Sequence, residues 1–183
     1  MPTNQRWWLT EDHVDTVISA DADTLYDMES DLPRIGEWSP ECEAVDWVDD
    51  TRDEARDDAA TPVAGTRFIG HNAVGPGRKI RYSRRGRVLV ADRGREFAFA
   101  TEEGGRESTT WRYRFEPHSE GTRVVESYHV AWIPWWARII DVPLDRHTEL
   151  VHNMHATLQN LKTAAERRPD PETHGAVAGT KEN

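Results

Sequence analysis

The sequence has very little cysteine: Cys42 is the only one among 183 residues, so the chain cannot form an intrachain disulfide. A chain of this kind is typical of a reducing compartment, and we expect a cytoplasmic protein. No apolar run approaches the roughly 20 residues of a transmembrane helix, and residues 1–10 lack the apolar core of a secretory signal. A net charge of -10 leaves little positive surface for phosphates, which argues against a nucleic-acid partner.

Catalytic, metal-binding and phosphate-binding motifs are scarce as well. The sequence contains no HExxH or CxxC pattern, and His152 and His155, three residues apart, lack a third ligand at a recognisable spacing. We therefore predict no metal site and no cofactor. There is no GxSxG elbow, and residues 70–79 do not fit the GxxxxGK[ST] phosphate loop, so neither serine nucleophilic catalysis nor a phosphate loop is expected.

The most extensive pattern is an alternation of apolar and polar residues, which is typical of β-strands with one buried face. It occurs at 12–20 and 41–49, and it continues through most of 65–132, where glycine-rich turns separate the segments. In residues 108–118 the alternation is strict, with aromatic side chains on one face and arginines on the other. Gly86 is a candidate β-bulge. The pattern predicts an antiparallel meander.

Helical signals flank this region. Asp21 is placed to cap a short helix, and Asp31 followed by Pro33 predicts a second one. Residues 142–168 carry an apolar stripe at alternating spacings of three and four, which predicts a long amphipathic helix beginning near Pro143. We expect one domain over 11–168, an N-terminal extension at 1–10, and a disordered tail at 169–183, which is polar and rich in small residues.

Six short motifs follow one another in this order of elements: GEWSPE (36–41), GTRFIGHN (65–72), REFAFAT (95–101), TWRYRFEP (110–117), GTRVVES (121–127) and TLQNLKTAAE (157–166). In these motifs the chain resembles the START/SRPBCC superfamily, and within it the polyketide cyclase/dehydrase-like branch. The resemblance implies an α+β helix-grip fold, in which a curved antiparallel sheet of about seven strands wraps around the C-terminal helix. It also implies a cavity for an apolar molecule such as a lipid, sterol, polyketide or quinone. Superfamily members include carriers, sensors, hydrolases and cyclases, so the fold does not select one activity.

Strand parity identifies the residues that would line such a cavity. If the aromatic face of residues 108–118 points inward, the same parity places apolar side chains of the neighbouring strands and of the long helix beside it. The predicted ligand-binding residues are Trp38, Ser39, Glu41, Phe68, Asn72, Phe97, Phe99, Trp111, Tyr113, Tyr128, Val151 and Met154.

Two polar residues on this inner surface are candidates for acid–base catalysis. Parity turns Glu126 inward, where a carboxylate is costly unless it is paired, hydrogen-bonded or neutralised. Glu126 is therefore either a buried structural partner of an arginine or tyrosine, or a polar anchor or general acid–base for a ligand. His147 interrupts the apolar stripe of the long helix, as a satisfied core residue or as a proton-transfer group.

The segment WSPE at 38–41 has two interpretations, a rim of the cavity or a structural corner. Trp132, Trp135 and Trp136 similarly suit a lid or core filler, a gate over the cavity, a homodimer contact or a membrane-surface anchor. The net negative charge counts against an anionic membrane and favours the gate or the dimer contact. Three functions follow: binding or transport of an apolar small molecule, a polyketide cyclase or dehydratase-like activity, and a protein-interaction module. The mostly aromatic and aliphatic inner surface favours binding.

Overall fold

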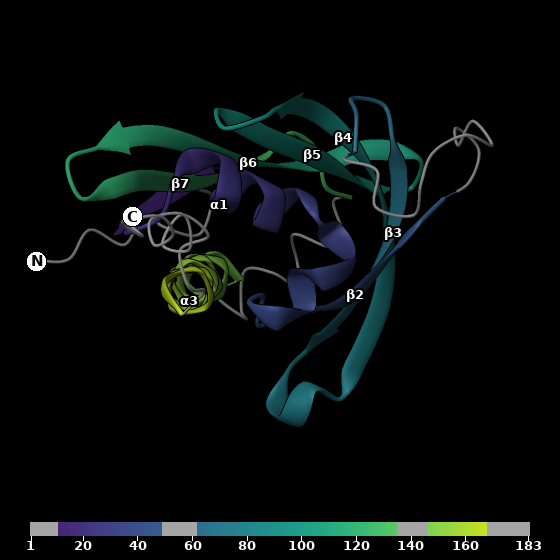
Figure 1. Cartoon of the computed structure of the whole chain (residues 1–183). Helices are drawn as coiled ribbons and strands as arrows, with labels where there is room; N and C mark the ends of the chain where they lie inside the picture. The colour runs from purple at the N-terminus through teal and green to yellow at the C-terminus, as the bar shows by residue number, and fades with distance from the viewer. Residues whose placement is uncertain (1–10, 49–61, 135–145, 168–183) are drawn as a thin grey trace, which may run out of the picture.

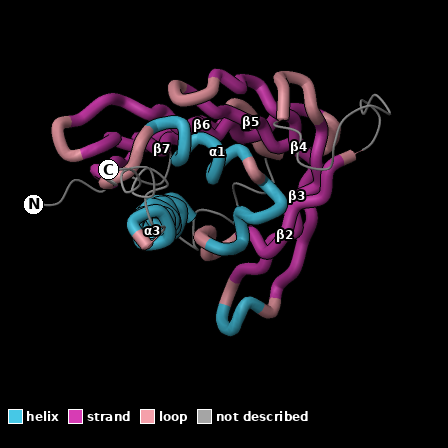
Figure 2. The backbone as a smooth tube through the Cα atoms, viewed as in Figure 1, coloured by secondary structure: helices cyan, strands magenta, loops and turns pink. Residues whose placement is uncertain are grey.

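A computed structural model describes residues 11–48, 62–134 and 146–167 of the chain. In these residues a curved antiparallel sheet holds the helices on its concave side (Figure 1). Colouring by secondary structure shows the same arrangement, with α3 and α1 both on the inner side of the strands (Figure 2). This arrangement is the predicted helix-grip fold.

The sheet has seven strands in the order β1-β7-β6-β5-β4-β3-β2. Their bounds are β1 Glu11–Ile18, β2 Cys42–Trp47, β3 Arg67–Val74, β4 Ile80–Asp92, β5 Glu96–Glu103, β6 Arg106–His118 and β7 Gly121–Val130. Strands β3 to β7 are consecutive neighbours, so the predicted meander is confirmed, while β1 and β2 form the two edges. The turn between β3 and β4 contains the short helix η3 (Pro76–Arg78), and Gly75 and Gly77 there have positive φ, which glycine adopts without steric cost.

Helices α1 (Ala22–Ser30) and η1 (Leu32–Glu37) connect β1 to β2, as predicted. Asp21 is the N-cap of α1, since its carboxylate accepts a hydrogen bond from the backbone N–H of Thr24 at 2.8 Å. Pro33 lies in the first turn of η1, where its missing N–H costs no intrahelical bond. These two helices bring residues 22–37 onto the inner face of the sheet.

The long helix α3 spans Arg146–Glu166, and the predicted start near Pro143 lies outside the described residues. Its stripe is confirmed, because Met154, Leu158 and Leu161 are each at most 1% exposed. Polar contacts fix the helix to the edge strand, where Lys162 Nζ donates to the carbonyl oxygen of Val17 at 2.7 Å. The helix is thereby held against β1 and faces the sheet across the core.

The core is built from the inner faces of the strands and the apolar sides of α1 and α3. Aromatic rings meet edge to face, with centroids 6.0 Å apart for Tyr26 and Phe97 and 5.5 Å apart for Phe68 and Phe99. Such edge-to-face pairs contribute beyond their buried area because a ring edge is positive and its face negative.

The prediction of a bulge at Gly86 is wrong. Gly86 pairs regularly with Phe68 in β3 and Thr101 in β5, and the irregularity in β4 lies between Val88 and Val90. A glycine occurs at 86 because the Phe68 ring lies across its backbone: a Cβ there would approach the ring to 2.2 Å. The glycine makes room for an aromatic side chain of the core.

Candidate functional site

Two carboxyl groups lie buried inside the core: Glu29 on α1 is 0% exposed and Glu126 on β7 is 2% exposed. They are close enough for a charge on Glu29 to raise the pKa of Glu126. We call these two residues the carboxyl pair. The inward direction that parity predicts for Glu126 is the one observed, whereas Glu29 was not among the predicted site residues.

Two polar aromatic side chains adjoin the carboxyl pair. The hydroxyl of Tyr113 on β6 donates to Glu126 Oε1 at 2.9 Å. Trp38, at the end of η1, is 1% exposed, and its indole N–H lies near enough to Glu29 to lower the pKa of that carboxyl somewhat. The Trp38 N–H nonetheless meets no hydrogen-bond geometry with Glu29. Within the described residues, Trp38 Nε1, both Glu29 oxygens and Glu126 Oε2 all lack a hydrogen-bond partner.

Burial decides the protonation of the carboxyl pair. It raises the pKa of Glu29 from the usual 4.5 to about 8, because an isolated carboxylate is poorly solvated in an apolar interior. Burial, and then the charge of Glu29, hold the pKa of Glu126 well above its usual range, against a smaller opposite effect of the Tyr113 hydrogen bond. Burial also raises the pKa of Tyr113. At neutral pH the cluster is therefore largely uncharged.

A second polar arrangement joins α3 to the edge of the sheet. His147 Nδ1 and the hydroxyl of Tyr128 are 2.5 Å apart, and His147 Nε2 lies 3.3 Å from a carboxylate oxygen of Asp12. Asp12 and Tyr128 are directly opposed in the β1–β7 ladder and so project from the same face. We call Asp12, His147 and Tyr128 the Tyr–His–Asp chain.

In the Tyr–His–Asp chain, a proton on Nε2 faces the carboxylate and leaves Nδ1 to accept from the tyrosine hydroxyl. Tyr128 is 3% exposed, and the pKa of its phenol is raised to about 12 by burial and, second, by the negative charge of Asp12. The hydroxyl therefore keeps its proton at neutral pH. The two nitrogens of His147 connect a buried phenol to a half-buried carboxylate.

The WSPE corner contacts α3. Glu41 accepts hydrogen bonds from Tyr82 of β4 and, at 3.3 Å, from the amide of Asn153 of α3. Ser39 Oγ accepts from the backbone N–H of Cys42 at 3.1 Å, a local contact that shapes the turn. Of the predicted rim residues, Trp38 reaches the carboxyl pair, whereas Ser39 and Glu41 make these structural contacts.

The other predicted site residues occupy the inner face in two groups. Phe68, Phe97 and Phe99 are buried and form one continuous set of ring contacts, while Trp111 is half-buried and packs on Tyr128 with ring centroids 5.6 Å apart. From α3, Met154 is buried and Val151 half-buried, and both belong to the same core.

Asn72 is half-buried and opposes Cys42 in β2 and Tyr82 in β4. Trp132 contacts the β5–β6 hairpin instead, where the Arg106 guanidinium lies 5.5 Å from its ring centroid. Trp135 and Trp136 lie outside the described residues.

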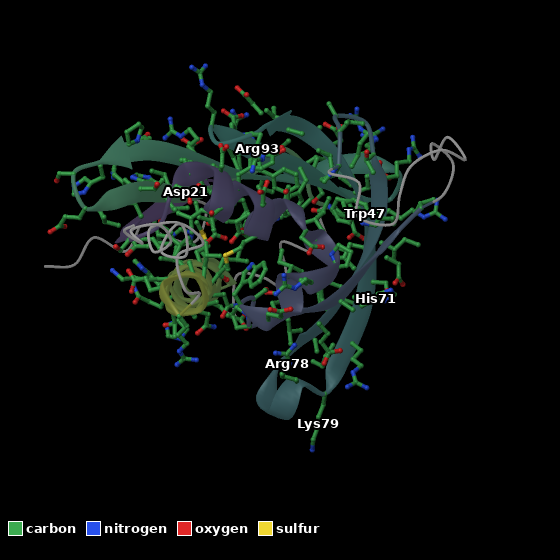
Figure 3. The ribbon with its side chains drawn as sticks, in the orientation of Figure 1. Asp21, Trp47, His71, Arg78, Lys79 and Arg93 are labelled. Carbon is green, nitrogen blue, oxygen red and sulfur yellow. The ribbon has the colours of Figure 1, made fainter. Side chains whose placement is uncertain are left out.

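Charged side chains gather elsewhere, on the outer surface and the hairpin ends. Arg78 and Lys79 lie at the tip of the β3–β4 hairpin (Figure 3), and Arg78 donates to the carbonyl oxygen of Pro40. Arg93 bonds to Asp23 and Asp27 on the exposed side of α1. Within the described ranges, no group of three or more His, Cys, Asp or Glu side chains is arranged to hold a metal ion, and no helix is long and apolar enough to cross a membrane.

Sequence reasoning missed Glu29, although a signal was present. Glu29 lies four residues after Leu25 and one after Met28, and so borders the apolar stripe of the first short helix. A carboxyl beside an apolar stripe is usually a solvated edge residue. Only the depth at which α1 enters the concave face shows that Glu29 is a buried residue and not a solvated one.

Comparisons with known proteins agree with this fold. Residues 18–141 match the sequence model of a family described as polyketide cyclase / dehydrase and lipid transport. No match was found among curated proteins. Among solved structures, the Polyketide_cyc-like protein Cgl2372 from Corynebacterium glutamicum is 25% identical, with a TM-score of 0.54 over 92% of this chain and 98% of that one. TTHA0849 from Thermus thermophilus is 22% identical, with a TM-score of 0.57 over 85% of this chain and 97% of that one.

The di-domain ARO/CYC StfQ from the steffimycin biosynthetic pathway also shares the fold, at 14% identity and a TM-score of 0.65 over 86% of this chain. The chain spans 50% of the length of StfQ. At this identity the likeness concerns the fold alone. The family match covers well over half of the sequence and includes α1, η1 and strands β2 to β7 in full. The chain therefore belongs to the polyketide cyclase/dehydrase and lipid transport family.

Proposed function

We propose that the protein binds an apolar small molecule between the inner face of the sheet and α3. The observation that carries this proposal is the set of buried polar atoms around the carboxyl pair. A buried donor or acceptor without a partner is costly, and native proteins pair nearly all of them with protein, water or ligand. A bound molecule with one polar end and an apolar body would satisfy both the carboxyl pair and the aromatic surface around it.

The family description, which includes lipid transport, supports an apolar ligand. The role of StfQ in a biosynthetic pathway is a property of that protein and supports a polyketide-like ligand only by analogy. Within this proposal the ligand is a lipid, a polyketide or a quinone-like molecule. Cytoplasmic localisation and a homodimer stay predictions.

Gly70 offers a direct test. It lies on the inner face of β3 between Phe68 and Asn72, and a Cβ there would meet no heavy atom closer than 3.8 Å. Gly70→Leu should occupy interior space without straining the strand. His71→Leu is the matched control, because it introduces the same side chain at the next residue on the outer face, where His71 is 41% exposed.

The measurement is native mass spectrometry of the purified protein, together with titration of an uncharged apolar fluorophore. We expect a co-purifying molecule or saturable fluorophore binding in the parent protein and in His71→Leu, and at least a tenfold weaker affinity in Gly70→Leu. Equal affinities in all three proteins would contradict an interior binding site.

The Tyr–His–Asp chain favours a second candidate function, acid–base catalysis on the bound molecule. A phenol hydrogen-bonded to an imidazole, which a carboxylate orients in turn, provides a route for moving protons to or from a carbonyl compound. The test is hydrogen–deuterium exchange at the carbon between the carbonyls of an apolar 1,3-diketone, followed by NMR. Acceleration that persists in Tyr128→Phe and His147→Gln would exclude this chain from catalysis.

A further inference from the structure

The carboxyl pair and its neighbours contain more hydrogen-bond donors than acceptors. Each protonated carboxyl supplies one O–H donor and one carbonyl acceptor, and an indole supplies a donor alone. Tyr113 already occupies Glu126 Oε1, so the second oxygen of Glu126 carries the proton and faces no partner in the described structure. Three donors then remain, on Glu126, Glu29 and Trp38, against one unoccupied acceptor on Glu29.

We propose that Glu29, Glu126 and the Trp38 indole N–H form a donor site for an uncharged acceptor oxygen, the carbonyl of a ketone, quinone or ester on an apolar ligand. This inference rests on the proposed function and specifies the ligand class of the same site. A carbonyl oxygen has two lone pairs and no proton, so it can accept from two of the three donors while the third donor meets the free Glu29 oxygen.

The same site disfavours a carboxylate ligand. The buried polar residues in the described part of the chain are Glu29, Ser30, Ser108, Thr122, Glu126 and Thr157, and none of them is cationic. The side chain of His147 is only 8% exposed as well, but its two ring nitrogens already face Tyr128 and Asp12. A ligand anion would therefore enter an apolar interior without a counter-charge, which is strongly unfavourable. An alcohol adds one more donor to a site that already has an excess, so we expect it to bind less well than a ketone.

The donor site also depends on pH. The pKa of Glu29 is about 8, and ionisation of this carboxyl converts a hydrogen-bond donor into an acceptor. The titratable groups that face the pair are Tyr113 and, near that tyrosine, Cys42, and burial keeps both protonated beyond this pH. Affinity for a carbonyl ligand should consequently fall as the pH rises through about 8.

The experiment compares three ligands of one chain length, a methyl ketone, a secondary alcohol and a fatty acid, by displacement of the uncharged fluorophore at pH 7. The parent protein should bind the ketone at least about tenfold more tightly than the fatty-acid anion, since a charge-free hydrogen bond and an unpaired buried charge differ by more than 1.4 kcal/mol. Ketone affinity should fall several-fold between pH 7 and pH 9.

Two substitutions of Glu29 separate the effect of its hydrogen-bond donor from the effect of its ionisation. Glu29→Gln keeps an N–H donor and cannot ionise, so the ketone preference should remain while the pH dependence disappears. Glu29→Leu removes the donor, and the ketone preference should decrease to near that of a site without polar groups. If Glu29→Leu does not fold, Trp38→Phe removes a donor from the same site and serves in its place. Glu116→Gln, on the outer face of β6 beside Arg123, is the control carboxyl.

Each outcome bears on one of the two proposals. If the parent protein binds all three ligands alike, or binds the fatty acid most tightly, the donor site is wrong and the proposed binding function stands. If Glu29→Gln loses the preference for the ketone as Glu29→Leu does, a hydrogen bond donated by residue 29 does not explain that preference, and the donor site is again wrong. Failure of the parent protein to bind any apolar ligand would overturn the proposed function, and this inference with it.

Discussion

The buried carboxyl of Glu29 predicts an unusual pH dependence of stability. The perturbation is Glu29→Gln, which retains the shape and the polarity of the side chain and removes its ionisation. In the folded protein the pKa of Glu29 is about 8, against 4.5 for an ordinary glutamate, which represents the unfolded chain. Between these two values the unfolded chain releases a proton that the folded protein retains.

The sign follows from proton linkage. Because the folded state binds more protons than the unfolded state, the free energy of unfolding decreases as the pH rises from about 4.5 to about 8, and it levels off above that range. Within this window, each pH unit lowers the free energy of unfolding by about 1.4 kcal/mol for one fully buried group. Between pH 5 and pH 7.5 the unfolding free energy of the parent protein should therefore fall by roughly 3 kcal/mol because of Glu29, a decrease that Glu29→Gln does not undergo. Glu126 acts in the same direction and remains in both proteins.

The assay is urea denaturation followed by tryptophan fluorescence at four pH values between 5 and 8. The two proteins should have similar unfolding free energies near pH 5 and diverge steadily toward pH 8, with the variant more stable. Titration of the eight histidines is common to both proteins and cancels in the difference. Glu116→Gln, whose carboxylate bonds to Arg123 on the outer surface, should show no such divergence. Parallel curves for the parent protein and Glu29→Gln would refute the assignment of a neutral buried Glu29.

Three further predictions concern other contacts of the interior. Gly86→Ala should destabilise the protein by about 1–3 kcal/mol, because the new methyl group would overlap the Phe68 ring; Gly70→Ala, which has room for a Cβ, is its control, and equal denaturation midpoints would contradict the steric explanation. Tyr113→Phe should cost about 1–2 kcal/mol in denaturation at pH 6, since it leaves a buried carboxyl without its hydrogen bond; no loss would mean that water replaces the hydroxyl. Burial raises the pKa of Cys42 to about 11, so its reaction with a disulfide reagent at pH 8 should be about 100-fold slower than that of a free thiol; a rate near that of free cysteine would show that the side chain is accessible.

The sequence by itself determined the elements and their inner faces. An alternation of period two is a property of the extended backbone, so it assigns Tyr113 and Glu126 to one face before any packing is known. The stripe of α3 follows in the same way from helical geometry, and short glycine turns make consecutive strands neighbours. These are local rules, and the meander with its gripping helix satisfies them throughout.

Only the tertiary structure decided which polar groups meet. Glu29 and Glu126 lie on elements far apart in the chain, and they become a pair because α1 packs deeply enough into the concave face for its border residue to lose contact with water. Likewise His147 joins Asp12 and Tyr128 through the angle at which α3 crosses the edge of the sheet. Periodicity assigns a residue to one side of its own element. The depth and angle of packing between elements depend on the combined shapes of many side chains, which no local pattern contains.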